Sequence, residues 1–126
     1  MGVSEEIFHD ATRVAIVPKG FCYRGVTANS GDKPPMRICA PSWHPRLLPL
    51  RRHIQPTLLV GRCAICRCLG VGQVGQHVAA FKDAPAGYFP LPHHSWRYIG
   101  WERRNPWFGE RLLPELRYQV ARVLNL

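Results

Sequence analysis

The amino-acid sequence predicts an α/β domain built on a parallel sheet. Three short apolar runs have the character of strands, at residues 13–17, 57–60 and 88–91, and segments with helical spacing separate them. Strands that alternate with helices are typical of α/β proteins. With 126 residues, 46% of them hydrophobic, the chain is long enough for one compact core and too short for two. We therefore expect residues 1–126 to form a single domain.

The N-terminal part opens with a capping pattern. Ser4 is followed by two glutamates, which predicts a short helix that ends near Asp10. Residues 13–17 then have the pattern of a buried strand, and Pro18 ends it. The stretch from 20 to 35 is rich in glycine and proline and predicts a long loop. Loops of that length inside a compact domain are usually functional.

The middle of the chain predicts a helix, a strand and a second helix. Residues 41–54 have the apolar spacing of an amphipathic helix, which Pro45 and Pro49 would shorten or kink. Residues 57–60 form the second apolar run, and Gly61 opens a helix that continues through residue 69. The middle of the chain therefore contributes one of the strands that alternate with helices.

The C-terminal part predicts a strand, a polar loop and a helix. The strand at 88–91 leads into the polar cluster 92–95. Asn105 and Pro106 have the pattern of a helix cap and first helical residue, and apolar residues then recur at helical spacing to Leu124. Pro114 should start or bend that helix. Ligands of parallel sheets bind beyond the carboxyl ends of the strands, so the segments after the first and third predicted strands, 18–39 and 92–98, are the expected site.

Charge predicts a polyanionic partner. The chain has 17 Lys and Arg against 8 Asp and Glu, a formal net charge of +9. Fourteen of the basic residues are arginine, whose planar guanidinium suits phosphate oxygens and base edges. A solvated basic surface without a ligand is the alternative interpretation.

Composition also bears on location and on the cysteines. The sequence has no run of about eighteen apolar residues, and its first ten residues carry acids where a signal peptide would carry basic residues. We therefore expect a cytoplasmic protein without a membrane partner. Five cysteines in a chain without an export signal indicate reduced thiols or metal ligands rather than disulfides.

Five motifs, in this order along the chain, resemble the uracil-DNA glycosylase superfamily, in particular the bacterial proteins related to its iron–sulfur-containing members. The motifs are Gly20–Gly25, Gly31–Pro35, Cys39–Pro41, Leu91–Arg97 and Asn105–Phe108. The resemblance implies a three-layer α/β/α fold with a parallel sheet. It also implies base-excision repair, in which uracil is flipped out of DNA and its N-glycosidic bond is hydrolysed.

The resemblance assigns roles to the polar loop. His93 stands at the histidine of the family's His-Pro-Ser motif and would donate a hydrogen bond to uracil as negative charge develops on it. Ser95 matches the serine of that motif, which places the loop against DNA. His94 replaces the proline, and Trp96 and Arg97 are further expected DNA contacts. The other aromatic residues that flank the last helix are interpreted as core and cap contacts.

The cysteines fall into two groups. Cys22 and Cys39 match two of the ligands with which similar glycosylases hold a [4Fe–4S] cluster, which needs four thiolates. The family's other two ligands have no counterpart here. Cys63, Cys66 and Cys68 lie on one predicted helix. Cys63 and Cys66 have metal-ligand spacing, but we favour the interpretation that all three pack as small hydrophobic side chains.

Three departures from the family pattern predict reduced activity. The family's Gly-rich N-terminal motif, with the first central strand that carries it, has no counterpart before Val14. Pro18 and Tyr98 each stand where an asparagine is expected. The first hypothesis is therefore a truncated uracil-DNA glycosylase-like protein that is weak or inactive. A non-catalytic basic DNA-binding module and a small cysteine-based metal protein are the alternatives, and no protein partner is predicted.

Overall fold

A computed structural model describes residues 2–126, apart from the side chain of Trp96. The described chain divides into two compact units. Unit 1 contains residues 2–15 and 55–126, and unit 2 is Ile16–Ile54. Among the described residues, no helix combines the length and the apolar character that crossing a membrane requires.

The sheet of unit 1 is a pair of parallel strands. β1 (Thr57–Val60) pairs in register with β2 (Tyr88–Leu91), from Thr57 opposite Tyr88 to Val60 opposite Leu91. The predicted strands at 57–60 and 88–91 and the expected parallel sheet are thus confirmed. Parallel neighbours need a crossover connection, and here it consists of three helical segments, α3 (Gly61–Leu69), α4 (Val74–Ala79) and the 3₁₀ turn η2 (Phe81–Asp83).

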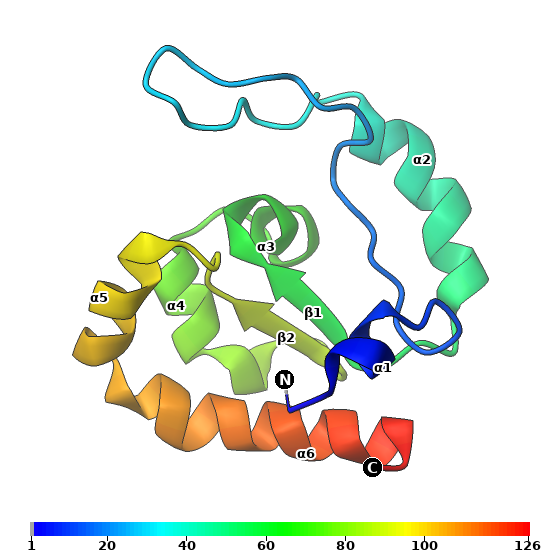
Figure 1. Cartoon of the computed structure of the whole chain (residues 1–126), viewed down its shortest axis with the longest axis vertical. Coiled ribbons are helices and arrows are strands. Elements are labelled where there is room, and N and C mark those ends of the chain that lie inside the picture. The colour runs from blue at the N-terminus through cyan, green and yellow to red at the C-terminus, as the bar shows by residue number, and fades with distance from the viewer. Residues whose placement is uncertain (1) are drawn as a thin grey trace. The chain divides into compact units, whose positions relative to one another are not determined.

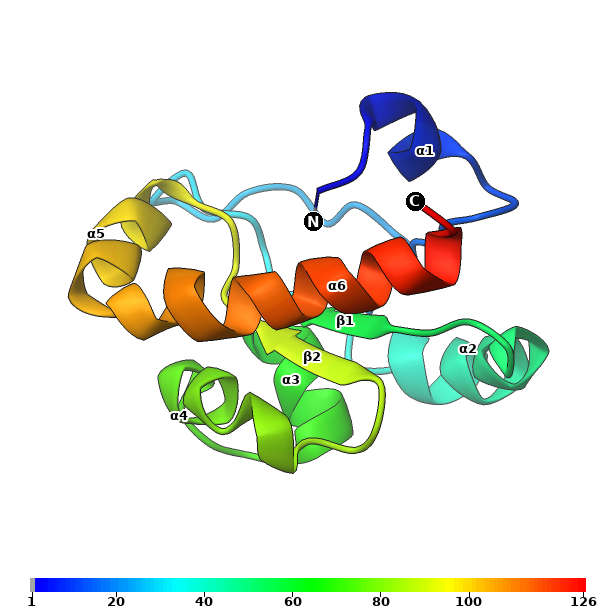
Figure 2. The same ribbon diagram turned by 90° about the horizontal axis from the view of Figure 1, so that it is seen from below.

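Helices lie on both sides of this strand pair. Three further helices belong to unit 1: α1 (Glu5–His9), α5 (Trp96–Arg104) and α6 (Leu113–Leu124). Figures 1 and 2 show α6 running along one side of the strands, with α3 and α4 on the other. Unit 1 is therefore a small mixed α/β unit, as expected for an α/β protein.

One apolar core holds the layers of unit 1 together. Leu112, Leu116 and Val120 recur at four-residue spacing on one face of the C-terminal helix, and all three are buried. The rest of the core comes from the strands and the crossover: Leu59, Ile65, Val78, Phe81, Phe89 and Phe108. Burial of this stripe against the strands accounts for the position of α6.

The last helix begins with a π turn. Pro106 and Trp107 are helical, η3 (Phe108–Leu112) has π geometry, and the N–H of Leu113 donates to the carbonyl of Phe108, five residues earlier. Pro114 has no N–H to continue the regular α-helical ladder. The prediction that Pro114 starts or bends this helix is therefore confirmed.

The N-terminal segment contains one confirmed and one wrong prediction. Ser4 caps α1, its hydroxyl accepting from the N–H of Ile7 at 3.3 Å. Residues 13–17 do not form the predicted strand. The N–H groups of Arg13 and Val14 both donate to the carbonyl of Asp10, at 2.9 Å each, which closes a turn at the start of the run. The rest of the run is not paired into the sheet and leaves Ile16 68% exposed.

Unit 2 contains a loop and a short helix. The predicted loop at 20–35 folds back on itself through a bridge between Val26 and Asp32. The helix predicted at 41–54 has different bounds: α2 spans Cys39–Leu47, and a 3₁₀ turn, η1 (Leu48–Arg51), follows. Starting at Cys39 places Pro41 in the first helical turn, where its missing N–H needs no partner.

Candidate active site

The carboxyl ends of the two strands bring two loops of unit 1 together. Val60 and Leu91 form the last pair of the sheet. Gly61 follows β1 and opens α3. β2 continues into the predicted polar loop 92–95, called the histidine loop below. The loop thus lies at the edge of the sheet where α/β proteins bind their ligands.

His93 packs against Gly61. A Cβ atom built on Gly61 would lie 3.3 Å from Cβ and 3.4 Å from Cδ2 of His93. Gly61 also has a φ of +80°, a conformation that L side chains rarely adopt. The positive φ favours glycine at the start of α3, and a larger side chain there would also have to displace His93 by a few tenths of an ångström. His93 itself remains exposed to solvent.

The neighbours of His93 lead into α5. His94 is exposed, and its ring lies 5.7 Å from that of Tyr98 between centroids. Ser95 is the N-cap residue of α5, yet its hydroxyl makes no capping hydrogen bond. Arg97 is exposed in the first turn. The side chain of Trp96 lies outside the described part of the structure.

Tyr98 occupies the helix face behind this loop. Partial burial raises the pKa of the Tyr98 phenol, and the negative charge of Glu102 and a hydrogen bond to it raise that pKa further. The phenol therefore stays neutral at ordinary pH. Tyr98 ends the segment 92–98 in which the site was expected, whereas Glu102 was not predicted as part of it, because α5 itself was not predicted.

An aromatic cluster anchors α5 to the core. Trp101 lies 5.3 Å from Phe108 and 5.8 Å from Trp107 between ring centroids, in edge-to-face contact. Asn105 accepts a hydrogen bond from the indole N–H of Trp107 at 3.2 Å and donates to the carbonyl of Trp101 at 2.8 Å. The interpretation of these aromatic residues as core and cap contacts is confirmed. The cluster holds the helix that follows the histidine loop.

The two segments expected at one sheet edge lie in different units. Residues 92–98 belong to unit 1, whereas 18–39 belong almost entirely to the loop of unit 2. Because the strand expected at 13–17 does not form, the sheet gives no reason to place 18–39 beside His93.

Cys22 and Cys39 are both free thiols of unit 2. Cys22 is exposed and Cys39 is buried at the start of α2. Among the described residues, no three His, Cys, Asp or Glu side chains are grouped so that they could hold a metal ion. A [4Fe–4S] cluster needs four thiolates, so this cysteine pair does not by itself fit one.

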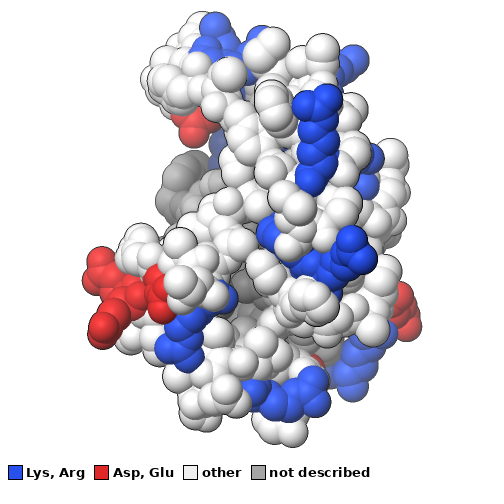
Figure 3. Space-filling view, turned by 90° about the vertical axis from the view of Figure 1, so that its right-hand side faces the viewer, with Lys and Arg blue, Asp and Glu red and all other residues white. Residues whose placement is uncertain are grey.

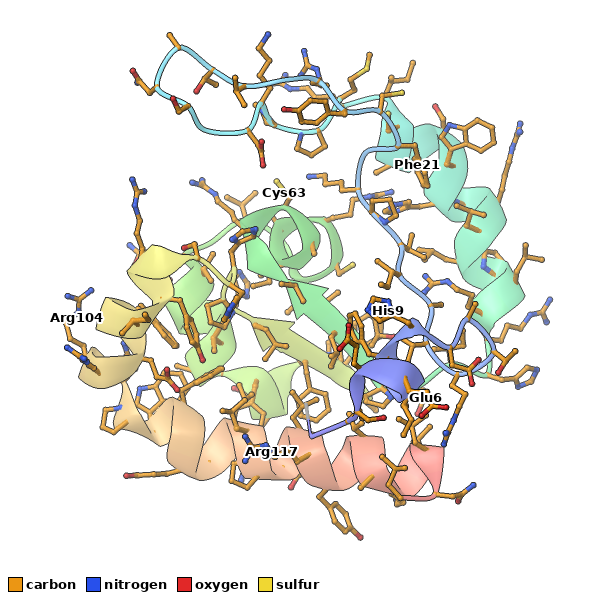
Figure 4. All side chains as sticks on the ribbon, in the orientation of Figure 1. Glu6, His9, Phe21, Cys63, Arg104 and Arg117 are labelled. Atoms are coloured by element: carbon orange, nitrogen blue, oxygen red, sulfur yellow. The ribbon has the colours of Figure 1, made fainter. Side chains whose placement is uncertain are left out.

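The cysteines of α3 are more exposed than predicted. Cys63 and Cys68 are exposed, and Cys66 is partly buried. The interpretation that all three pack as small hydrophobic side chains is wrong for the two exposed ones. Successive residues of a helix project in different directions, and Ile65 fills the core from this helix instead. Figure 4 shows Cys63 on the side of α3 away from the strands.

A cavity of about 510 Å³ lies at the opposite end of the strands. Gln55 and Tyr88, next to the amino ends of β1 and β2, line it together with Glu115, Gln119 and Arg122 of α6. Parallel sheets bind their ligands at the carboxyl ends, so this cavity is a weaker candidate than the histidine loop.

Basic side chains are distributed over the surface. Figure 3 shows one face on which Lys and Arg outnumber Asp and Glu and are separated by uncharged side chains. Figure 4 shows Arg104 of α5 projecting outward into solvent.

No protein-family model matches the chain.

Proposed function

We propose that this chain is a uracil-DNA glycosylase-like protein of base-excision repair, with His93 as its catalytic residue and uracil-containing DNA as its partner. The observation that carries the proposal is the position of His93. It follows a parallel strand at the carboxyl edge of the sheet, is exposed, and is held against the glycine that starts the neighbouring helix. The proposed fold is the three-layer α/β/α type with a parallel sheet.

In the proposed reaction, water forms a bond to the sugar C1′ and loses a proton to the solvent while the bond from C1′ to uracil breaks. The electron pair of that bond leaves with uracil, so negative charge develops on the departing base. A ring N–H of His93 donates to a uracil oxygen and stabilises this charge. Contact with Gly61 limits how far the histidine can shift during this step.

The residues after His93 are assigned to the DNA backbone. The Ser95 hydroxyl is not used in helix capping, and the first turn of α5 points its N–H groups toward this loop. Arg97 adds a guanidinium in the same turn, and His94 and Trp96 complete the proposed contacts. Such contacts position the duplex without reading its sequence.

We propose that excision is weak. The described sheet has two strands, so its carboxyl edge supplies two strand-to-helix loops to a uracil pocket. The segment expected to add a third strand, residues 13–17, forms a turn and an unpaired stretch instead. A pocket with few walls admits water and holds a flipped base loosely, which lowers the stabilisation of its developing charge.

The test is release of uracil from single-stranded and duplex oligonucleotides by the full chain. Wild type, His93→Ala and a control variant, His9→Ala, are compared. His9 is also exposed in unit 1 but lies on α1. Slow release that is lost in His93→Ala and kept in His9→Ala supports the proposal. Release that persists in His93→Ala contradicts it, as does no release from folded wild type.

The second candidate function is non-catalytic DNA binding. It is favoured by the charge of unit 2, whose 39 residues contain seven of the 17 Lys and Arg and one of the eight acids. This function predicts affinity for DNA that falls steeply as salt rises, because phosphate neutralisation releases counterions. Binding that is insensitive to ionic strength would contradict it.

A further inference from the structure

Unit 2 concentrates positive charge in a short segment. It contains Asp32 as its single acid and seven basic residues: Lys19, Arg24, Lys33, Arg37, Arg46, Arg51 and Arg52. Two of the arginines make hydrogen bonds to carbonyls of their own unit, Arg24 to Pro34 at 3.0 Å and Arg52 to Pro49 at 3.2 Å. Such an excess raises the local concentration of a polyanion.

The same unit exposes aromatic rings. Trp43 of α2 is 48% exposed and Phe21 of the loop is 44% exposed. Their ring centroids lie 6.3 Å apart in edge-to-face geometry. The contact between the two rings restricts their movement, and about half of each side chain stays accessible to a ligand. Tyr23, which is 81% exposed, adds a third ring two positions along the loop.

Two contacts fix this aromatic group beside a cation. The guanidinium carbon of Arg46 lies over the Trp43 ring, 5.7 Å from its centroid. On the neighbouring helical position, a ring nitrogen of His44 lies 3.0 Å from the carbonyl of Pro18, and this hydrogen bond joins α2 to the start of the loop. The two aromatic rings and the Arg46 guanidinium therefore lie next to one another in unit 2.

We propose that this basic aromatic surface, formed by Phe21, Trp43 and Arg46, binds single-stranded DNA by stacking bases on its rings. Basic side chains combined with open aromatic faces are the composition of single-strand binding surfaces. In duplex DNA the faces of the bases are stacked within the double helix. Trp43 could therefore meet its phosphates but no free base face. The surface lies wholly within unit 2, and it acts independently of the excision proposed for His93.

The test measures binding of a labelled oligothymidylate by fluorescence anisotropy, using the full chain. An abasic oligonucleotide of equal length carries the same phosphates without bases. Trp43→Ala should weaken binding of oligothymidylate roughly 5- to 100-fold and leave binding of the abasic strand unchanged. Arg46→Ala should lower the slope of log affinity against log salt by roughly 0.7.

Control variants separate stacking from misfolding and from the excision site. Trp43→Phe keeps an aromatic face and should retain most of the affinity. Tyr118→Ala removes an exposed ring of α6 in unit 1 and should change nothing. Oligothymidylate contains no uracil, so failure of uracil release leaves this inference standing. Equal binding of both strands by wild type, or full affinity in Trp43→Ala, would overturn it.

Discussion

The Cβ atom of His93 lies 3.3 Å from the position that a Cβ atom on Gly61 would occupy. The two residues follow neighbouring parallel strands, and 31 positions of sequence separate the strands' paired ends. Contact between them therefore depends on the pairing of β1 with β2. It joins the start of α3 to the loop on which the excision proposal rests.

Gly61→Ala should destabilise the protein and displace His93. The φ of +80° costs an L residue about 1–2 kcal/mol, and the new methyl group must push the histidine away. Urea unfolding measures the first effect and uracil release the second. Gly100→Ala is the matched control, because a Cβ there meets nothing within 4 Å and alanine favours the helix by about 0.5–1 kcal/mol. Equal stability of the two variants would show that Gly61 is not constrained.

Ile65→Ala should lower the stability of the protein, because Ile65 belongs to the core of unit 1. Ile65 is 0% exposed on α3, whereas Ile99 is 57% exposed on α5. Truncating the buried side chain leaves a cavity and should cost about 2–5 kcal/mol, while Ile99→Ala should stay within about 0.5 kcal/mol of wild type. Chemical denaturation of both variants checks the difference. Similar midpoints for the two would mean that α3 does not pack as described.

Asn105→Ala should loosen the aromatic cluster. The substitution leaves the indole N–H of Trp107 and the carbonyl of Trp101 without their partner. A partly buried group without its hydrogen bond costs about 1–3 kcal/mol. Near-ultraviolet circular dichroism and thermal unfolding should both change. Gln119→Ala, which removes an exposed side-chain bond to Glu115, should leave both signals near wild type.

Tyr98 should ionise at higher pH than an exposed tyrosine. Burial and the neighbouring Glu102 raise its folded-state pKa above the ordinary tyrosine value of 10.0, so folding favours the neutral phenol. The resulting stabilisation is present below the unfolded-state pKa and is lost as pH rises through the folded-state pKa. Ultraviolet titration of tyrosinate should lose its highest step in Tyr98→Phe. Loss of that step in Tyr118→Phe instead would contradict the assignment.

Much of the local structure could be predicted from the pattern of residues. Ser4 and the glutamates after it marked α1, and the apolar runs at 57–60 and 88–91 marked both strands. These features depend on neighbours within a few positions. Helix α5 was missed because its residues are strongly polar on average, and its place is secured by contacts of Trp101 with residues beyond its own end.

For the candidate site, the sequence predicted His93 but not Gly61, the residue against which His93 packs. His93 was predicted from a motif and from its position after a strand, and the structure places it at the carboxyl edge of the sheet. Gly61 was read as the start of a helix and not as part of the site. A glycine directly after a strand is a usable indication of close packing, but the partner that requires it cannot be named until the strands are paired.

By itself, the sequence determined the basic charge, the two strands, the capped first helix and the break at Pro114, because each follows from composition or from residues close in the chain. The pairing of 57–60 with 88–91, and the exclusion of 13–17 from the sheet, became known from the folded structure. The folded structure also shows that Ile65, and not the cysteines beside it, enters the core. The physical reason is that a strand needs hydrogen-bond partners, and a buried side chain needs a surface, from distant parts of the chain.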